Sequence, residues 1–226
     1  MFKLSLLGNS KKNMINDTKM NSVLNYVLKN AKQDDPRSVL DTIDSFVLET
    51  ETFLMNVGPE KGKLLAETIK DLMPLKALEL GSFLGYSAIT IAMFLPKAGS
   101  LVSIDHDKDS ITASKEIVKY AGLENKVHFI NSASDEAISN LEEAFDFIFI
   151  DHEKNRYYSD LLLMEKLNLI NKGGIVFADN VGIFEDKMKD YFAHVRDSGA
   201  YTSKNIGAHL EYRDNVYDAV EISKFN

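Results

Sequence analysis

Short apolar segments alternate with helical patterns from about Leu75 to Ala178, and this alternation limits the chain to a small set of folds. The segments KALEL, SLVSI, KVHFI, FDFIFI and GGIVFA have the continuous apolar character of strands that are buried on both faces. Strands of this kind, separated by helices, are typical of a parallel sheet that helices cover. Because right-handed crossovers bring the carboxyl ends of these strands to one edge, we expect a ligand to bind there.

The segments on either side of this alternation predict further elements. Helical spacing predicts helices over residues 22–31, 36–50 and about 59–72, with Ser22 as the N-cap of the first and Pro36 in the first turn of the second. The tail, residues 202–225, has the pattern of two strands around a turn that close the sheet by antiparallel pairing. The patterns together predict an α/β fold: a doubly wound, mostly parallel sheet with helices on both faces and extra N-terminal helices.

The length of 226 residues fits one domain, which we expect to span residues 21–226. Residues 1–20 are expected to be a disordered leader, because a short apolar start is followed by the polar run GNSKKNMINDTK. No apolar run has the length of a membrane span, and the start lacks the features of a signal peptide. A cytoplasmic protein that binds no membrane is therefore expected.

The residue types present exclude several kinds of chemistry. The chain contains no cysteine, which rules out a thiol nucleophile, a disulfide scaffold and a cysteine-ligated metal site. The formal net charge of -8 disfavours a nucleic-acid partner, since such proteins usually carry a basic stripe. The sequence therefore leaves a protein that acts on a small-molecule substrate through side chains with oxygen and nitrogen groups.

A glycine-containing loop follows the first predicted strand. Gly81 and Gly85 allow a tight turn and a close approach of backbone to ligand, but the spacing matches neither the dinucleotide fingerprint nor the phosphate loop. A plain strand-to-helix turn is an equally good interpretation of this glycine pair. Asp105, after the second strand, suits a ribose hydroxyl, although the same DHDKDS cluster also suits a helix N-cap.

Acidic and amide side chains follow two later strands. Asp151 begins the run Asp-His-Glu-Lys after the fourth strand, and Asp179 and Asn180 follow the fifth. Hard oxygen ligands in this number favour Mg²⁺, while His152 leaves a transition metal open. Each aspartate alone is more readily explained as a helix cap, but the two together with Asn180 favour a metal site.

The chain resembles a known family. The segments that carry the resemblance are MNVG (Met55–Gly58), LELGSFLGYSA (Leu78–Ala88), IDHEKNRY (Ile150–Tyr157), ADNV (Ala178–Val181) and HLEYR (His209–Arg213). In this order they are similar to the class I S-adenosylmethionine-dependent O-methyltransferases, and more narrowly to the catechol O-methyltransferases, from about residue 25 to about residue 222. The resemblance implies a seven-stranded, Rossmann-like sheet, a catechol-type small-molecule substrate, S-adenosylmethionine as methyl donor, and Mg²⁺.

The resemblance also assigns roles to residues. It implies Mg²⁺ ligands at Asp151, Asp179 and Asn180, a general base at Lys154, and at Glu211 a carboxylate for the second substrate hydroxyl. It implies donor contacts over the methionine part, the ribose and the adenine at Met55, Asn56, Val57, Glu79, Gly81, Tyr86, Ser87, Asp105, Ser134, Asp151 and His152.

The chain departs from this family mainly at the entrance for the substrate. Phe53 and Glu153 stand where catechol enzymes carry tryptophan, Phe184 stands where they carry proline, and Leu210 keeps their apolar residue. Near the donor, Asp105 replaces a glutamate, and Asp135 a glutamine. Glu153 predicts an entrance that favours cationic or larger polar catechols; the alternative is that its side chain simply points into water.

Other functions fit the sequence less well. A caffeoyl-coenzyme A type O-methyltransferase shares the metal scheme but matches the MNVG and HLEYR segments less well. A nucleotide-cofactor oxidoreductase lacks its fingerprint here, and a non-catalytic binding protein is expected to lose Lys154 or a metal ligand. An RNA methyltransferase is disfavoured by the acidic charge, and either a monomer or a homodimer is consistent with the sequence.

Overall fold

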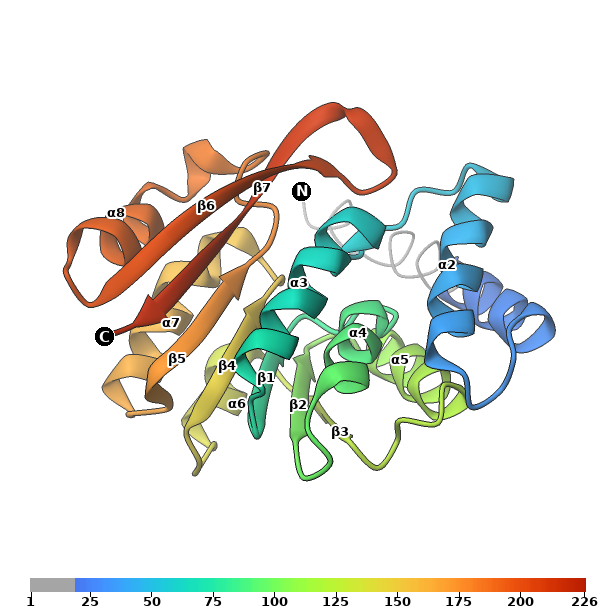
Figure 1. Ribbon diagram of the computed structural model, residues 1–226, viewed down its shortest axis with the longest axis horizontal. Helices are drawn as coiled ribbons and strands as arrows, with labels where there is room; N and C mark the ends of the chain where they lie inside the picture. The colour runs from blue at the N-terminus through green and yellow to red at the C-terminus, as the bar shows by residue number, and fades with distance from the viewer. Residues whose placement is uncertain (1–18) are drawn as a thin grey trace, which may run out of the picture.

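The computed structural model describes residues 19–226, which form a three-layer α/β structure around one sheet (Figure 1). The expected leader lies outside the described residues up to residue 18. Its last two residues belong to the first helix, which runs to residue 30, and Met20 is buried. The expected N-cap at Ser22 is therefore wrong, because the chain is already helical before Ser22.

The sheet has seven strands in the order β3-β2-β1-β4-β5-β7-β6. Parallel pairing joins the first five in sequence, whereas β7 runs antiparallel to both β5 and β6. This confirms the predicted mostly parallel sheet with an antiparallel C-terminal end. The strands are β1 (Lys76–Leu80), β2 (Ser100–Asp105), β3 (Val127–Asn131), β4 (Phe145–Ile150), β5 (Ile170–Ala178), β6 (Tyr201–Leu210) and β7 (Arg213–Phe225).

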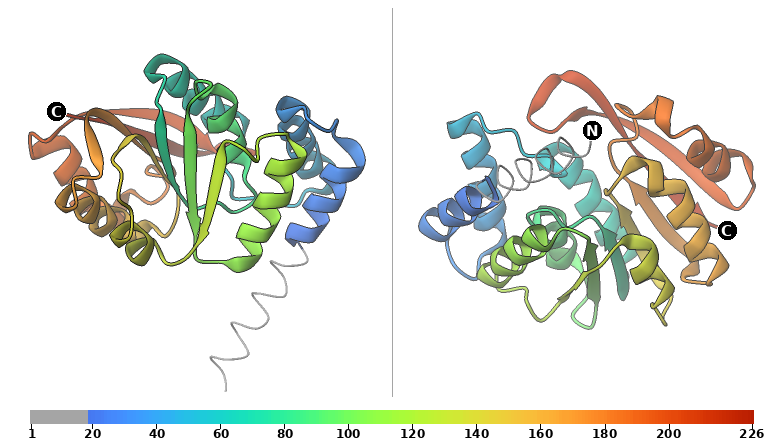
Figure 2. Two further views of the ribbon diagram at one scale, coloured as in Figure 1. Left: turned by 90° about the horizontal axis from the view of Figure 1, so that it is seen from below. Right: turned by 180° about the vertical axis from the view of Figure 1, so that it is seen from behind.

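Helices cover both faces of the sheet, as Figure 2 shows from two further sides. The remaining α-helices are α2 (Pro36–Thr50), α3 (Gly58–Leu72), α4 (Tyr86–Phe94), α5 (Lys108–Tyr120), α6 (Ser134–Ser139), α7 (Tyr157–Lys166) and α8 (Lys189–Asp197), with short 3₁₀ turns η1 (Lys154–Arg156) and η2 (Glu185–Lys187). The N-terminal helices and α3–α5 share one core cluster, and α6–α8 contribute to the other.

Strand β4 shows why the sheet requires both layers. Phe147 and Phe149 belong to the core cluster on one face, while Ile148 and Ile150 belong to the cluster on the other. Successive side chains of a strand point to opposite faces, so a continuous apolar strand needs apolar partners on both sides. The continuous apolar pattern of this strand is therefore explained by its burial on both faces of the sheet.

Two helices follow from local signals. Asp35 caps α2 by accepting a hydrogen bond from the backbone N–H of Ser38, and Pro36 takes the first turn as expected. The apolar pattern YYSDLLLMEKLNLI predicts a helix over residues 157–170, but α7 ends at Lys166. Asn168 adopts a left-handed conformation with φ of 56°, which ends the helix and starts β5 at Ile170.

The long β6–β7 hairpin reaches beyond the sheet toward the start of α3 (Figure 1). This brings Glu211, directly after β6, into contact with Lys61 of α3, which precedes it by 150 positions in the chain. Among residues 19–226, no helix combines the length and apolar character that crossing a membrane requires.

Candidate active site

The carboxyl ends of β4 and β5 lie side by side and present two aspartates at the same edge. The register pairs Ile150 with Ala178, so Asp151 and Asp179 are the next residue on each strand. The Asp179 side chain is fully buried, and that of Asp151 is 13% exposed. Two carboxylates held this close create a site that attracts a cation.

Lys154 lies beside these aspartates because the chain turns directly after β4. Its Nζ donates to Asp151 Oδ1 at 2.7 Å and to the hydroxyl of Tyr157 at 2.6 Å. Tyr157 in turn donates to the backbone oxygen of Asp179 at 3.1 Å. The amine is thus held between the ends of β4 and β5, with its side chain 12% exposed.

A buried cluster of three carboxylates adjoins Asp179, and one lysine joins its members. Lys61 Nζ lies 2.7 Å from Asp179 Oδ1, 2.6 Å from Glu211 Oε1 and 2.7 Å from Asp218 Oδ2. Burial raises the pKa of Asp179 and of Glu211, and the Lys61 cation opposes this in both. Burial also acts to raise the pKa of Asp218, but Lys61, Asn180 and a backbone N–H outweigh it, so that pKa is below its usual value.

Asn180 connects this cluster to the end of β5. Its Nδ2 donates to Glu211 Oε1 at 2.8 Å and to Asp218 Oδ2 at 2.9 Å, and its backbone has φ of 54°. Three buried oxygens nearby have no hydrogen-bond partner among the described residues: Asp179 Oδ2, Asn180 Oδ1 and Glu211 Oε2. Buried acceptors without donors are costly, and two carboxylate oxygens with an amide oxygen are ligands that Mg²⁺ accepts. The donor set therefore fits a divalent cation or a hydroxyl-bearing ligand.

The glycine loop after β1 packs directly on the end of β4. Gly81 has φ of 104°, and a Cβ there would lie 2.6 Å from the backbone oxygen of Asp151, so only glycine fits. Asp105 fixes the same loop by accepting from the backbone N–H groups of Ser82 and Phe83 at 2.9 and 3.2 Å. Asp107, rather than Asp105, caps α5.

Glu79, the first residue of the loop motif, is fully buried. One oxygen accepts a short hydrogen bond from Ser103, and Oε1 has no hydrogen-bond partner among residues 19–226. Burial raises the pKa of Glu79 to about 8, Ser103 and Ser87 oppose the rise, and Asp151 and Asp105 add to it. A buried acid in this state is ready to pair with a cationic ligand group.

One cavity collects several of the residues predicted to contact the donor. Gly81, Asp105, Ser134 and His152 line it, and Glu153 of the predicted substrate entrance lines it as well. The His152 ring stacks on Tyr157 and its Nε2 lies 2.8 Å from Asp160 Oδ2, while its buried Nδ1 has no partner in the described structure. These positions leave an apolar-walled space with free polar atoms at the sheet edge, as expected of a nucleoside site.

Arg156 forms one side of the same cavity. It donates to Ser134 Oγ at 3.1 Å and pairs with the exposed Asp135 at 2.7 Å. Asp135, which replaces the family's glutamine, therefore forms an ion pair at the rim of the cavity.

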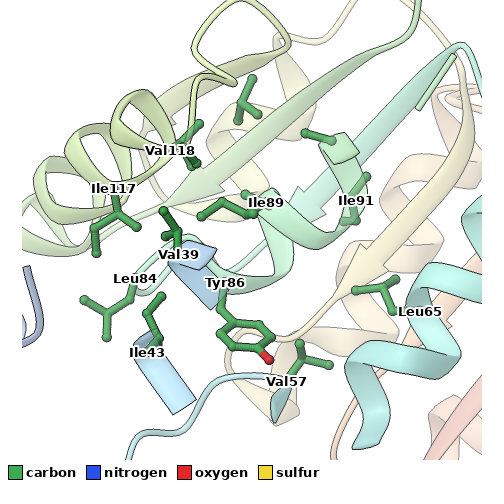
Figure 3. Close-up of a cluster of buried hydrophobic side chains, with 14 of the residues drawn as sticks. Val39, Ile43, Val57, Leu65, Leu84, Tyr86, Ile89, Ile91, Ile117 and Val118 are labelled. Carbon is green, nitrogen blue, oxygen red and sulfur yellow. The ribbon is translucent and has the colours of Figure 1, made fainter. Parts of the chain in front are cut away.

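The Met55–Val57 segment directly precedes α3. Asn56 and Val57 are buried, whereas Met55 is 43% exposed. Asn56 Oδ1 accepts from the backbone N–H of Gly58 at 3.0 Å. Figure 3 shows the ring of Tyr86 close to Val57 and Ile43, so this segment and the start of α4 share one packed cluster; Ser87, the next residue of α4, is also buried.

The predicted entrance residues do not all lie together. Phe184 has Lys154 6.0 Å from its ring centroid and Lys187 at 5.4 Å, and Leu210 is buried directly before Glu211. The guanidinium of Arg213 lies over the ring of Phe53 at 5.0 Å. Glu153 is exposed and lines the donor cavity, not the carboxylate cluster.

Lys61, Asp218 and Tyr157 belong to the site and were not predicted from the sequence. Lys61 carries a detectable signal, because Val57, Lys61, Leu65 and Ile69 recur every four residues and are all buried. A lysine in such an apolar row requires a buried anionic partner. Asp218 has a similar signal, as an acid within the buried part of β7.

Comparison with known proteins gives a consistent result. The chain matches the family of O-methyltransferases over residues 30–197. Catechol O-methyltransferase B of Danio rerio is 37% identical over 213 residues, which cover 92% of this chain and 79% of that protein. Catechol O-methyltransferase of Mus musculus is 35% identical over 213 residues, with the same coverage of 92% and 79%.

Solved structures share the fold. The O-methyltransferase TomG from Streptomyces achromogenes, in complex with S-adenosylmethionine, has a TM-score of 0.74 at 21% identity and covers 87% of this chain and 92% of its own. An O-methyltransferase from Bacillus cereus, in complex with S-adenosylhomocysteine, has a TM-score of 0.71 at 18% identity, with 91% of each chain covered. The sequence match over most of its length shows that this chain belongs to the O-methyltransferase family, with catechol O-methyltransferases among its relatives.

Proposed function

We propose that this protein transfers a methyl group from S-adenosylmethionine to one hydroxyl of a catechol-type substrate, and that the reaction depends on Mg²⁺. The observation that carries the proposal is the set of unpartnered buried oxygens on Asp179, Asn180 and Glu211, beside the amine of Lys154. A hard cation and two adjacent hydroxyls are partners of the right chemistry for such oxygens. The relatives named as catechol O-methyltransferases support the same substrate class.

Asp151, Asp179 and Asn180 are the residues that would hold Mg²⁺. When bound, the ion lowers the pKa of a hydroxyl that coordinates it and fixes the direction of the oxygen. Glu211 would accept from the second hydroxyl through its free Oε2, which has no other partner in the described structure. This requirement for two neighbouring oxygens is the reason for proposing a catechol rather than a simple phenol.

The donor would lie in the cavity beside the glycine loop, with its adenosine near Asp105, Ser134 and His152. Its methionine end would then approach Glu79, Gly81, Tyr86 and Ser87. The free Oε1 of Glu79 suits the α-ammonium group of the donor, because pairing with a cation removes the cost of a buried unpartnered carboxyl oxygen. The structures of TomG with S-adenosylmethionine and of the Bacillus cereus enzyme with S-adenosylhomocysteine support a donor of this kind.

The proposed reaction is an in-line displacement at the methyl carbon. The substrate oxygen forms a bond to the methyl carbon, the carbon–sulfur bond breaks, and its electron pair stays on sulfur, which leaves as a neutral thioether. Lys154, in its neutral form, takes the proton of the reacting hydroxyl and passes it to solvent. The main contribution of the protein is orientation of oxygen, methyl carbon and sulfur in one line.

An activity screen tests this proposal. The purified protein is incubated with S-adenosylmethionine, Mg²⁺ and a panel that contains catechols, matching monophenols and a caffeoyl thioester, and the methylated position is read by NMR. We expect catechols to be methylated on one oxygen, with activity lost in chelator and restored by Mg²⁺. Full activity in chelator, or equal rates on monophenols, would exclude the proposed scheme, and preference for the thioester would favour the caffeoyl-coenzyme A class.

The charge at the entrance predicts part of the substrate preference. Glu153 is exposed at the rim of the donor cavity, and Arg213 covers Phe53. Replacement of the acid by an aromatic residue, Glu153→Trp, is expected to reduce the preference for cationic over acidic catechols at low ionic strength. An unchanged ratio of kcat/KM for a dopamine-like and an acidic catechol means that Glu153 only faces water.

A further inference from the structure

Lys61 is a buried lysine whose donors are all engaged by the site. The side chain is 1% exposed, and its amine contacts one oxygen each of Asp179, Glu211 and Asp218 at 2.6–2.7 Å. An ammonium group has three N–H donors, so three acceptors match its capacity. Lys61 lies in the first turn of α3, and this helix begins directly after the Met55–Val57 segment.

The amide of Asn180 shares two of these acceptors. Glu211 Oε1 and Asp218 Oδ2 each receive both Lys61 Nζ and Asn180 Nδ2. If the amide were flipped, its oxygen would face two carboxylate oxygens, which is repulsive. The shared acceptors therefore fix Nδ2 toward the cluster and leave Oδ1 on the other side without a partner.

Asp218 fixes the chain that follows Asn180. Its second oxygen, Oδ1, accepts from the backbone N–H groups of Gly182 and Ile183 at 3.2 and 3.0 Å. Gly182 lies so close to β7 that a Cβ there would be 2.6 Å from the backbone nitrogen of Ala219. One carboxylate thus holds Lys61, the Asn180 amide and the loop after β5 together.

We propose that Lys61 and Asp218 are a positioning pair that orients Asp179, Asn180 and Glu211, so that their free oxygens face the metal ion and the substrate. The pair touches neither the donor nor the reacting atoms. It acts on the side of each ligand that faces away from the metal ion, where a fixed partner sets the direction of the oxygen that binds it. This inference rests on the proposed function and adds the residues that determine its geometry.

The charges of the pair give a matched set of variants. Lys61→Met leaves three buried carboxylates without their cation, and Asp218→Asn leaves the lysine with one acid fewer. The double variant removes one positive and one negative charge, so the net charge of the site is unchanged. Replacing both members of a buried ion pair is often tolerated, whereas removing one is strongly destabilising. Lys63→Met, an exposed lysine on the same helix, is the control.

The test measures Mn²⁺ binding by electron paramagnetic resonance in the presence of S-adenosylhomocysteine and without substrate. Folding is checked by circular dichroism, and KM and kcat are measured with catechol. For the folded double variant we expect Mn²⁺ affinity to fall about 10–100-fold and the catechol KM to rise, with the affinity for S-adenosylhomocysteine unchanged. Lys63→Met is expected to match the wild type in all of these.

The outcomes separate this inference from the proposed function. Wild-type protein that binds no Mn²⁺ overturns the metal scheme itself. Wild-type binding together with equal Mn²⁺ affinity and equal catechol KM in the folded double variant overturns only the positioning pair. If the double variant does not fold, Asp218→Asn alone decides, because it keeps the shape of the residue: unchanged Mn²⁺ affinity overturns the pair, and weakened affinity supports it.

Discussion

At the scale of single residues, Lys154, the proposed general base, shows how few contacts fix the position of an amine. Its amine bonds to Asp151, directly after β4, and to the hydroxyl of Tyr157, the first residue of α7. That hydroxyl is fixed in turn by the backbone oxygen of Asp179, directly after β5. The amine therefore has a defined position even though its side chain is partly exposed. A mobile surface lysine loses side-chain conformational entropy when it is ordered against a substrate. The side chain of Lys154 is already ordered in the folded protein, so this cost does not arise at the reaction.

The first prediction concerns Lys154→Met, which keeps most of the apolar stem and removes the amine. We expect kcat to fall about 10²–10⁴-fold, the usual contribution of a positioned acid or base. Binding of S-adenosylhomocysteine, measured by calorimetry, is expected to change little, because Asp151 is the only predicted donor contact that the amine bonds to among the described residues. The exposed Lys189→Met serves as the control, and unaltered turnover in Lys154→Met removes this residue from the mechanism.

Glu79 supports a prediction about pH. Its pKa is raised by burial from an ordinary value of 4.5 to about 8 in the folded protein. Between these values the folded protein retains a proton that the unfolded chain has released. This contribution to stability is therefore fully present below pH 4.5 and is lost as the pH rises through 8.

Glu79→Gln cannot ionise and removes this pH-dependent contribution. In the absence of the methyl donor, we expect the Tm of the wild type to fall relative to that of the variant between pH 5 and pH 8. The fall is about 2–4 °C for each kcal/mol lost from the free energy of unfolding. Differential scanning calorimetry across this range makes the comparison. Parallel Tm profiles for the two proteins contradict the assignment.

Residues differ in how far the sequence alone could identify them. Asp151 and Asp179 were predicted because they directly follow apolar strands, and parallel strands bring such ends together. Asp218 contacts Lys61 across 157 positions of sequence, and that pairing depends on how far the hairpin reaches beyond the sheet. Local patterns identify Lys61 and Asp218 each as a charged residue in a row of apolar residues, but they do not show that the two are partners.

At the scale of elements, Asp44 connects three parts of the fold. From α2 it accepts hydrogen bonds from the hydroxyl of Tyr86 in α4 at 3.1 Å and from Tyr212 in the hairpin turn at 2.8 Å. Tyr212 also donates to Asn56 Oδ1 at 3.2 Å. Tyr212 follows Glu211 directly, so this network joins the N-terminal helices to both proposed binding regions.

The prediction here is Tyr212→Phe, which removes one hydroxyl and leaves the ring. Acceptors on the half-buried Asp44 and the buried Asn56 then lose a donor, and we expect a loss of stability of about 1–2 kcal/mol, measured by urea unfolding. The catechol KM is expected to rise, since the turn that carries Glu211 loses its tie to α2. Tyr217→Phe, in the same hairpin but 63% exposed, is the control, and equal effects of the two changes contradict the proposed tie.

The order of elements was predictable and some of their ends were not. Five parallel strands follow from continuous apolar runs, because a buried strand needs apolar residues on both faces. The end of α7 was misjudged because leucines continue through residue 169, and apolar character alone does not distinguish the last turn of a buried helix from the start of a buried strand. The left-handed Asn168 is the feature that separates the two.

At the scale of the whole molecule, the fold concentrates negative charge at one edge of the sheet. Asp151, Asp179, Glu211 and Asp218 come from three different segments, and the cations that contact them are those of Lys61 and Lys154. Carboxylates therefore outnumber cations in a region that is largely closed to water. Such an excess lowers stability until a further cation binds, and a divalent ion restores balance in one step.

The last prediction follows from this balance. A ligand that binds only the folded protein stabilises it by about 2.7 kcal/mol at a concentration 100 times its dissociation constant. Addition of Mg²⁺ to chelator-treated protein is therefore expected to raise the Tm by several degrees, followed by calorimetry at constant ionic strength. Sodium chloride at matched ionic strength is the control, because screening of exposed charges acts equally in both solutions. In Asp151→Ala we expect the increase with Mg²⁺ to disappear, while the Tm without Mg²⁺ stays similar or falls, because the ion pair of Asp151 with Lys154 is lost. An increase that sodium chloride reproduces, or that persists in Asp151→Ala, shows that the excess charge at this edge serves a purpose other than holding a divalent ion.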